Sequence, residues 1–157
     1  MITTNQLQAT LQLAERACLQ RKSRLTPKRR DVLTILLQEE KAVSAYELMA
    51  LFKAHFNKEL LTMTAYRTLE FLESMQLAHK LNIANKYVAC AHIGCETSHE
   101  LPHFLICQQC LRVDELSHDM PNNLNNITSK VEETGYQLYS PQIELNCICN
   151  MCFSAEA

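Results

Sequence analysis

The sequence has few of the residues that interrupt regular structure. Its 157 residues include two glycines, four prolines, no tryptophan and only 6% aromatic residues. This composition excludes a collagen-like chain, a linker-rich chain and an all-β domain with frequent turns. Apolar residues make up 47% of the chain, which is enough for a hydrophobic core and excludes a disordered protein. The length suits one large domain or two small ones.

Long apolar segments are also lacking. No run approaches the ~20 apolar residues that cross a membrane. The N-terminal residues 1–6 (MITTNQ) show no basic stretch followed by an apolar one, so no signal peptide is visible. We therefore expect a cytoplasmic protein with no membrane partner. Because cytoplasmic thiols stay reduced, its eight cysteines favour metal binding over disulfides.

The net charge of −2 conceals two unlike halves. Residues 1–89 hold 13 lysines and arginines against 8 acidic residues, whereas residues 90–157 hold 2 against 9. Seven of the eight cysteines lie at or after Cys90. The division predicts two domains, 1–89 and 90–157, of which the basic one faces a polyanion and the acidic one holds metal.

Helical periodicity dominates the basic half. Apolar residues recur at three- and four-residue spacing in the segments 6–21, 27–37, 44–52 and 62–72. Thr26 and Pro27 suit the start of the second segment. Ser44 and Glu47 have the spacing of a capping box at the start of the third.

The fourth helix has the features of a DNA-recognition helix. It buries leucines on one side and leaves Thr64, Tyr66 and Arg67 near its N-terminus, where side chains of such helices reach base edges. Two short strands, 77–81 and 86–90, follow and read as a β-hairpin. Helices followed by such a hairpin indicate a winged helix-turn-helix.

A cluster of cations precedes the second helix. Residues 21–30 contain six lysines and arginines, among them Arg24, Lys28 and Arg29. Alone, such a run is more often a solvated helix start. Next to a helix-turn-helix pattern we favour contacts of this segment, including Thr26, with DNA phosphates.

Two CxxC pairs stand far apart in the acidic half. Cys107 and Cys110 form one, and Cys149 and Cys152 form the other. Two such pairs in a reduced compartment predict a closed structural zinc site with four thiolates. A dithiol or disulfide pair is the less favoured alternative. Cys147 could replace Cys149, but the two-residue gap of the first pair favours Cys149.

A second group of potential ligands lies between and before these pairs. Five of the six histidines fall between residues 79 and 118. A single histidine here would more often be a surface residue, but imidazole, thiolate and carboxylate together suit tetrahedral zinc. The candidates are His79, Cys90, His92, Cys95, His99, His103 and Glu115.

The remaining pattern predicts a small α/β unit. We expect strands at 103–106 and 112–116, a helix at 121–134 ended by Gly135, and a last strand at 136–145 bent at Pro141. So small a sheet has exposed edges that a second copy would cover. The predicted fold class is α+β, an N-terminal winged helix-turn-helix domain followed by a small α/β dimerisation domain.

In combination, these motifs resemble the ferric uptake regulator (Fur) family, and within it the zinc uptake regulator (Zur) branch. The resemblance covers nearly the whole chain. It is carried by residues 24–29 (RLTPKR), 44–46 (SAY), 64–67 (TAYR) with Leu69 and Leu72, His79 with Lys80, 87–90 (YVAC), 105–110 (LICQQC), Glu115 and 149–152 (CNMC). Leu111 departs from the glycine usual after the first CxxC.

The resemblance implies a homodimer that binds operator DNA, with Tyr46 among the contacts. It implies one zinc held by Cys107, Cys110, Cys149 and Cys152. It implies a second, regulatory zinc held by His79, Cys90, His99 and Glu115. The loop after His92 looks long, so His103 is an alternative to His99. Two zinc ions per chain are expected.

The predicted function is a zinc-responsive repressor of zinc uptake genes that binds a pseudo-palindromic operator when the regulatory site is filled. Zinc is favoured because Cys90 offers a soft thiolate. The alternatives are an iron, manganese or peroxide sensor on the same scaffold and, less favoured, a CxxC redox protein. We expect no enzymatic activity and no small-molecule substrate.

Overall fold

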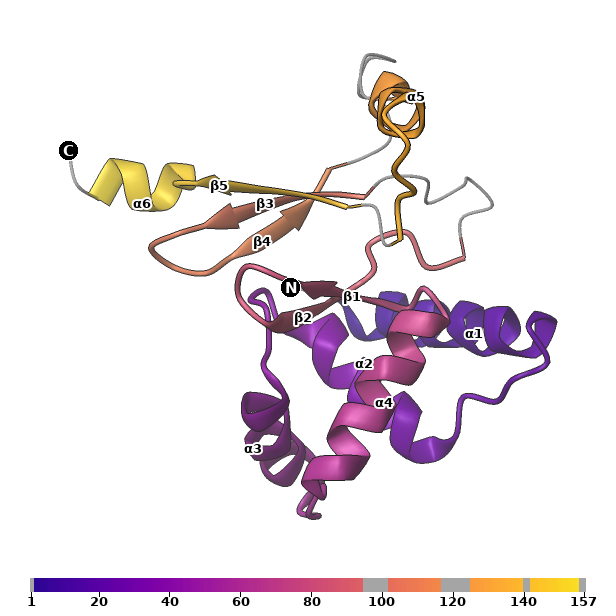
Figure 1. Ribbon diagram of the computed structural model, residues 1–157. Coiled ribbons are helices and arrows are strands. Elements are labelled where there is room, and N and C mark those ends of the chain that lie inside the picture. The colour runs from indigo at the N-terminus through magenta and orange to yellow at the C-terminus, as the bar shows by residue number, and fades with distance from the viewer. Residues whose placement is uncertain (1, 95–101, 117–124, 140–141, 156–157) are drawn as a thin grey trace.

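The computed structural model describes residues 2–94, 102–116, 125–139 and 142–155. Four helices come first, followed by a hairpin and then a small sheet with two further helices (Figure 1). The helices are α1 (Thr4–Gln20), α2 (Pro27–Gln38), α3 (Ala45–Phe56), α4 (Thr62–Ser74), α5 (Asn125–Glu133) and α6 (Asn150–Ala155). The strands are β1 (Ala78–Leu81), β2 (Lys86–Ala89), β3 (His103–Cys107), β4 (Val113–Glu115) and β5 (Ile143–Cys147).

The predicted winged helix is present. The helices α1 to α4 share one core, with Leu11, Leu33, Leu48 and Leu69 all at most 2% exposed. The β1–β2 hairpin forms the wing after α4. The hydrophobic periodicity therefore located all four helices, because each buries one apolar stripe against the others.

The helix starts agree with the sequence in part. Ser44 and Glu47 form the expected capping box at α3. Thr26 is the N-cap residue of α2 and Pro27 follows it, but the Thr26 side chain makes no capping hydrogen bond. The position of Thr26 was therefore predicted correctly, but the structure does not show the capping hydrogen bond that its side chain was expected to make.

The second half contains a three-stranded sheet in the order β4-β3-β5. The central β3 pairs antiparallel with β4 and parallel with β5. The chain passes through α5 between β4 and β5. Gly135 follows α5 with a φ of +84°, a backbone conformation that suits a helix end.

One expectation for this half was wrong, and one helix was missed. Residues 136–139 are not a strand, and Tyr136 and Tyr139 are exposed. Alternating residues form a strand only where another strand pairs with them. The helix α6 was not expected, because a six-residue helix shows too little periodicity for detection. The predicted residues 121–124 and Pro141 lie outside the described part of the chain.

The sheet lies against the wing (Figure 1). Phe104 and Ile106 of β3 form a cluster with Leu81 of β1 and Ala42. Gln142 Nε2 also donates to the Lys80 carbonyl oxygen over 2.7 Å. The wing is thus the element on which the sheet packs. None of the helices in the described ranges combines the length and apolarity that a membrane crossing requires.

Candidate metal centres and nucleic-acid interface

Four thiols meet at one end of the sheet. Cys107, Cys110, Cys149 and Cys152 each offer a sulfur within 4.8 Å of the others. Cys107 ends β3, Cys110 follows in the turn, and the other two flank the start of α6. The parallel pairing of β3 with β5 brings the two CxxC pairs together. Sequence spacing identified both pairs, and the strand pairing decides that they meet.

The geometry of these thiols fits tetrahedral zinc. Cys110 Sγ lies 3.7 Å from Cys149 Sγ, and Zn–S bonds of ~2.3 Å place tetrahedral sulfurs ~3.8 Å apart. Backbone N–H groups of Cys110 and Cys149 lower the pKa of the Cys107 thiol from 9.0 to about 6. Hydrogen bonding with Cys149 raises the pKa of Cys152 to about 12. A cation would stabilise all four thiolates together.

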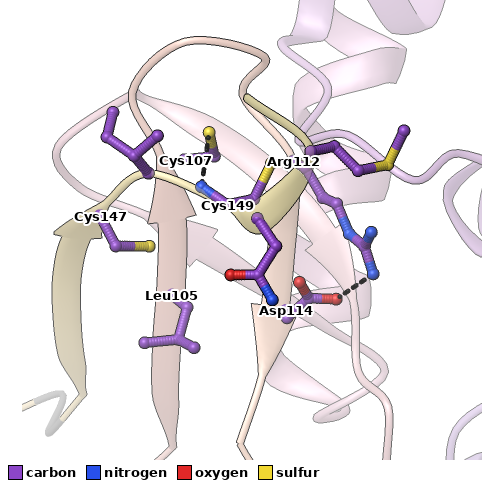
Figure 2. Close-up of a pocket in the computed structure, with 9 residues that line it drawn as sticks. Leu105, Cys107, Arg112, Asp114, Cys147 and Cys149 are labelled. Atoms are coloured by element: carbon purple, nitrogen blue, oxygen red, sulfur yellow. Dashed lines mark hydrogen bonds and ion pairs between the residues drawn. The ribbon is translucent and has the colours of Figure 1, made fainter. Parts of the chain in front are cut away.

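Cys147 is outside this group of four. It pairs with Cys107 across the strands, but it does not join the four sulfurs that lie within 4.8 Å of one another. Figure 2 shows the Cys149 N–H directed at Cys107 Sγ, with the Cys147 side chain apart from both on β5. Cys147 lines a pocket with Leu105 and Asp114 to which Cys107 and Cys149 also contribute. This arrangement favours Cys149 over Cys147 as the ligand.

A second group of potential ligands lies between the wing and the sheet. His79 Nε2 or Nδ1, Cys90 Sγ and a Glu115 carboxylate oxygen all lie within 4.8 Å of one another. His79 Nε2 is 3.6 Å from Glu115 Oε1, close to the ~3.4 Å expected between two ligands of tetrahedral zinc. All three side chains are at most 10% exposed. Imidazole, thiolate and carboxylate are a donor set that suits zinc.

Strand register explains how Glu115 reaches this place. Phe104 pairs with Glu115 on one side and with Glu144 on the other, so the three side chains share one face. Phe104 is fully buried and its ring centroid lies 5.1 Å from that of His79. The face of the sheet that packs on the wing therefore directs Glu115 towards His79.

Cys90 and His79 both belong to the N-terminal part of this arrangement. Cys90 is 1% exposed in the core formed by the four helices, and its N–H donates to Leu77 O over 3.0 Å. His79 lies on β1 of the wing. Glu115, which ends β4, is the potential ligand from the sheet. A metal here would join the two parts of the molecule.

The remaining predicted ligands have different outcomes. His99 lies outside the described residues, as does Cys95. His103 is buried on β3 but is not among the atoms grouped around His79. His92 was among the candidates in the sequence but was not assigned to the regulatory site. In the structure its Nδ1 lies 3.2 Å from Glu115 Oε1. The density of histidines was the only sequence evidence for it.

The candidate DNA-binding residues lie on and around the helix-turn-helix, and most are exposed. Thr64 and Tyr66 are half-buried on α4 and Arg67 is exposed. The exposed residues elsewhere are Arg24, Thr26, Lys28 and Tyr46. Two apolar side chains that the sequence did not single out, Leu61 and Met63, are also exposed at the start of α4.

Arg29 differs from its neighbours. Its guanidinium carbon lies 3.4 Å from the centroid of the Phe71 ring, and its Nη1 donates to Arg24 O over 2.9 Å. Arg29 therefore packs α2 against α4. Arg29 was predicted as a DNA contact, and the sequence did not indicate this internal packing contact.

The chain is similar in sequence and fold to known zinc uptake regulators. The zinc uptake regulation protein of Escherichia coli strain K12 is 32% identical over 151 residues, covering 96% of this chain and 85% of that protein. A zinc uptake regulator complexed with zinc and DNA has a TM-score of 0.84 at 31% identity, with 99% of both chains covered.

A third relative has been solved in two states. Holo XcZur gives a TM-score of 0.79 at 30% identity over 93% of this chain and 98% of that one. Apo XcZur gives 0.52 at 30% identity, over 96% and 99%. Residues 20–146 match the ferric uptake regulator family. Because that match spans most of the sequence, the chain belongs to the ferric uptake regulator family.

Proposed function

We propose that this protein is a zinc-responsive transcriptional repressor that binds pseudo-palindromic operator DNA as a homodimer and controls zinc uptake genes. The observation that supports this most directly is the group of His79, Cys90 and Glu115. These side chains come from the winged helix and the sheet, so a zinc ion among them would fix the position of one relative to the other.

The better fit to holo XcZur than to apo XcZur is consistent with this mechanism. As a whole chain, the structure is closer to the holo form of that relative than to its apo form. In a dimer, fixing each winged helix would set the spacing between two recognition helices. Such spacing decides which half-sites a dimer fits.

Zinc is proposed over iron or manganese because of Cys90. A buried thiolate is a soft ligand, and oxygen-rich sites suit manganese better. We propose two zinc ions per chain. The thiolates of Cys107, Cys110, Cys149 and Cys152 would hold the structural ion, and His79, Cys90 and Glu115 would hold the regulatory ion with His99 or His103 as the fourth ligand.

The proposed domains are residues 1–89 for DNA binding and 90–157 for metal binding and dimerisation, and the first residues of the second domain, Cys90 and Ile93, pack into the core of the first. The sheet face opposite the wing supports dimerisation. Leu105 and Leu145 share that face by register, and Leu145 is 46% exposed. Met151 and Phe153 of the nearby α6 are also largely exposed. A second copy would cover these apolar side chains.

The DNA interface is proposed at Arg24, Thr26, Lys28, Tyr46, Thr64, Tyr66 and Arg67, with a smaller part for Arg29. The exposed cations near the start of α2 would contact phosphates. Tyr66 and Arg67 on α4 would contact the major groove. Charge in this region suits a polyanion, because residues 1–89 carry most of the lysines and arginines.

The experiment is a metal titration of the purified protein. The probe is a labelled DNA duplex selected from random sequences in buffered zinc, and binding is followed by fluorescence anisotropy. We expect operator binding to appear at picomolar-to-nanomolar free zinc and to be lost in Cys90→Ser. Activation by iron or manganese, with zinc inert beyond one ion per chain, would contradict the proposal.

A further inference from the structure

We propose that His92 is a positioning residue of the site between wing and sheet, which holds the Glu115 carboxylate in the orientation that zinc requires. The inference rests on the proposed function. It assigns a role to a histidine outside the group of His79, Cys90 and Glu115. The role is to contact a ligand rather than the metal.

The contacts of Glu115 support this role. Its Oε1 lies 3.2 Å from His92 Nδ1, and its Oε2 accepts the Ala91 N–H over 2.9 Å. An ionised carboxylate only accepts hydrogen bonds, so in this contact the His92 ring would donate from Nδ1. Both oxygens of Glu115, whose side chain is 4% exposed, thus contact the segment 90–92.

The same segment also contacts the thiolate ligand. The His92 backbone N–H donates to Cys90 Sγ over 3.3 Å. One residue therefore contacts a ligand from the sheet through its ring and a ligand from the helical core through its backbone. Both contacts end on atoms that would also bind the metal, so they restrict where those two atoms can lie.

The segment that presents His92 is held in place at both ends. Cys90 and Ile93 are buried in the helical core. Gly94 has a φ of +83°, and a Cβ there would lie 3.0 Å from Leu13 side-chain atoms of α1. The turn is thus packed directly against α1, and the His92 ring is offered to Glu115 from a fixed backbone.

The geometry favours positioning over ligation. His92 is not among the residues whose ligand atoms all lie within 4.8 Å of one another, and its Nδ1 is directed at the carboxylate. Groups that orient metal ligands in this way affect metal affinity by ~10–100-fold when removed. The expected effect of losing the ring is therefore a weaker regulatory zinc with an unchanged structural zinc.

The test compares three variants of the full-length protein. His92→Leu removes the donor, and His92→Asn keeps an N–H donor close to the place of Nδ1. His55→Leu removes an exposed imidazole on α3 and serves as the matched control. Zinc affinity is measured by competition with a chromogenic chelator, and the site is also loaded with Co²⁺ to record its thiolate charge-transfer and ligand-field spectrum.

We expect His92→Leu to weaken the more easily removed zinc by ~10–100-fold and His92→Asn to recover most of that loss. The Co²⁺ spectrum of His92→Asn should match that of the unaltered protein. Unchanged zinc affinity in His92→Leu would overturn the proposal. So would equal weakening in both variants with an altered Co²⁺ spectrum, because this would make His92 a ligand.

These readouts are independent of DNA binding. If the unaltered protein binds its second zinc without gaining affinity for the selected duplex, the proposed function fails while the role of His92 is still decided by the affinities. If zinc controls DNA binding and His92→Leu changes nothing, only the positioning role fails.

Discussion

Glu144 on β5 accepts a 2.7 Å hydrogen bond from the backbone N–H of Asn82 in the wing. Its other carboxylate oxygen accepts the Ile83 N–H over 3.0 Å. Through the strand register, Glu144 shares a face with Phe104 and Glu115. One row across the sheet therefore contacts the wing at three points: the candidate metal ligand Glu115, the buried ring of Phe104 and the Glu144 carboxylate that binds the turn. The last two contacts need no metal.

The Glu144 contact predicts a local effect of Glu144→Gln. The neutral amide replaces one charged acceptor by a donor that faces an N–H group, so the wing tip should loosen. We expect the Asn82 and Ile83 amides to exchange with deuterium about tenfold faster, which corresponds to ~1.4 kcal/mol. The Leu33 amide in the core should be unaffected. Equal exchange rates at Asn82 in both proteins would show that the contact does not hold the wing.

Arg29 and Lys28 should respond differently to replacement by alanine. Arg29→Ala removes the guanidinium from the Phe71 ring, so the free energy of unfolding should fall by ~1–2 kcal/mol. Lys28→Ala should leave stability within ~0.5 kcal/mol and reduce the salt dependence of DNA binding by about one unit of slope. Urea denaturation measures the free energy of unfolding, and fluorescence anisotropy at several salt concentrations measures the salt dependence of DNA binding. If Arg29→Ala kept its stability and instead reduced the salt dependence of DNA binding, Arg29 would be a DNA contact and not a packing residue.

Glu47 predicts a pH-dependent stability. Hydrogen bonds from Lys86 and from the Ser44 backbone lower the pKa of its carboxyl from 4.5 to about 2. The folded state therefore favours the ionised form, and this stabilisation is complete above pH 4.5 and is lost as the pH falls towards 2.

Glu47→Gln should accordingly be less stable at pH 7 by at most ~1 kcal/mol, because the side chain is 51% exposed and solvent screens it. The difference between the two proteins in urea midpoint should shrink below about pH 4.5. Since both proteins have the same metal sites, metal loss affects them equally. A difference that grows on acidification would contradict the assigned pKa direction.

Cys149→Ser and Cys147→Ser form a matched pair at neighbouring positions. Cys149→Ser removes one of the four grouped thiols and should lose the zinc that resists chelation, together with structure in the C-terminal half, because structural zinc supplies folding free energy. Cys147→Ser should keep this tightly held zinc. Metal content by native mass spectrometry after mild chelation distinguishes them. Retention of tightly held zinc in Cys149→Ser, with loss in Cys147→Ser, would exchange the two roles.

Local features of the sequence determined much of this protein. The four N-terminal helices, the Ser44 capping box, the wing and the two CxxC pairs follow from periodicity and short spacing. Their physical causes act within a few residues, since a helix buries one stripe and two thiols three apart can reach one ion. For the same reason, residues 136–139 were misassigned: their alternation is local, but the partner strand that would be required is not.

Tertiary structure alone decided the rest. The sequence offered seven candidate ligands and the resemblance already named Glu115 among them, but only strand register explains how Glu115 comes to lie beside His79. Packing of α2 on α4 turns Arg29 from a surface cation into a partner of Phe71. The burial of Ile93 and the close approach of Gly94 to α1 place His92 beside Glu115. Each of these outcomes depends on contacts between residues distant in sequence, which composition and spacing do not encode.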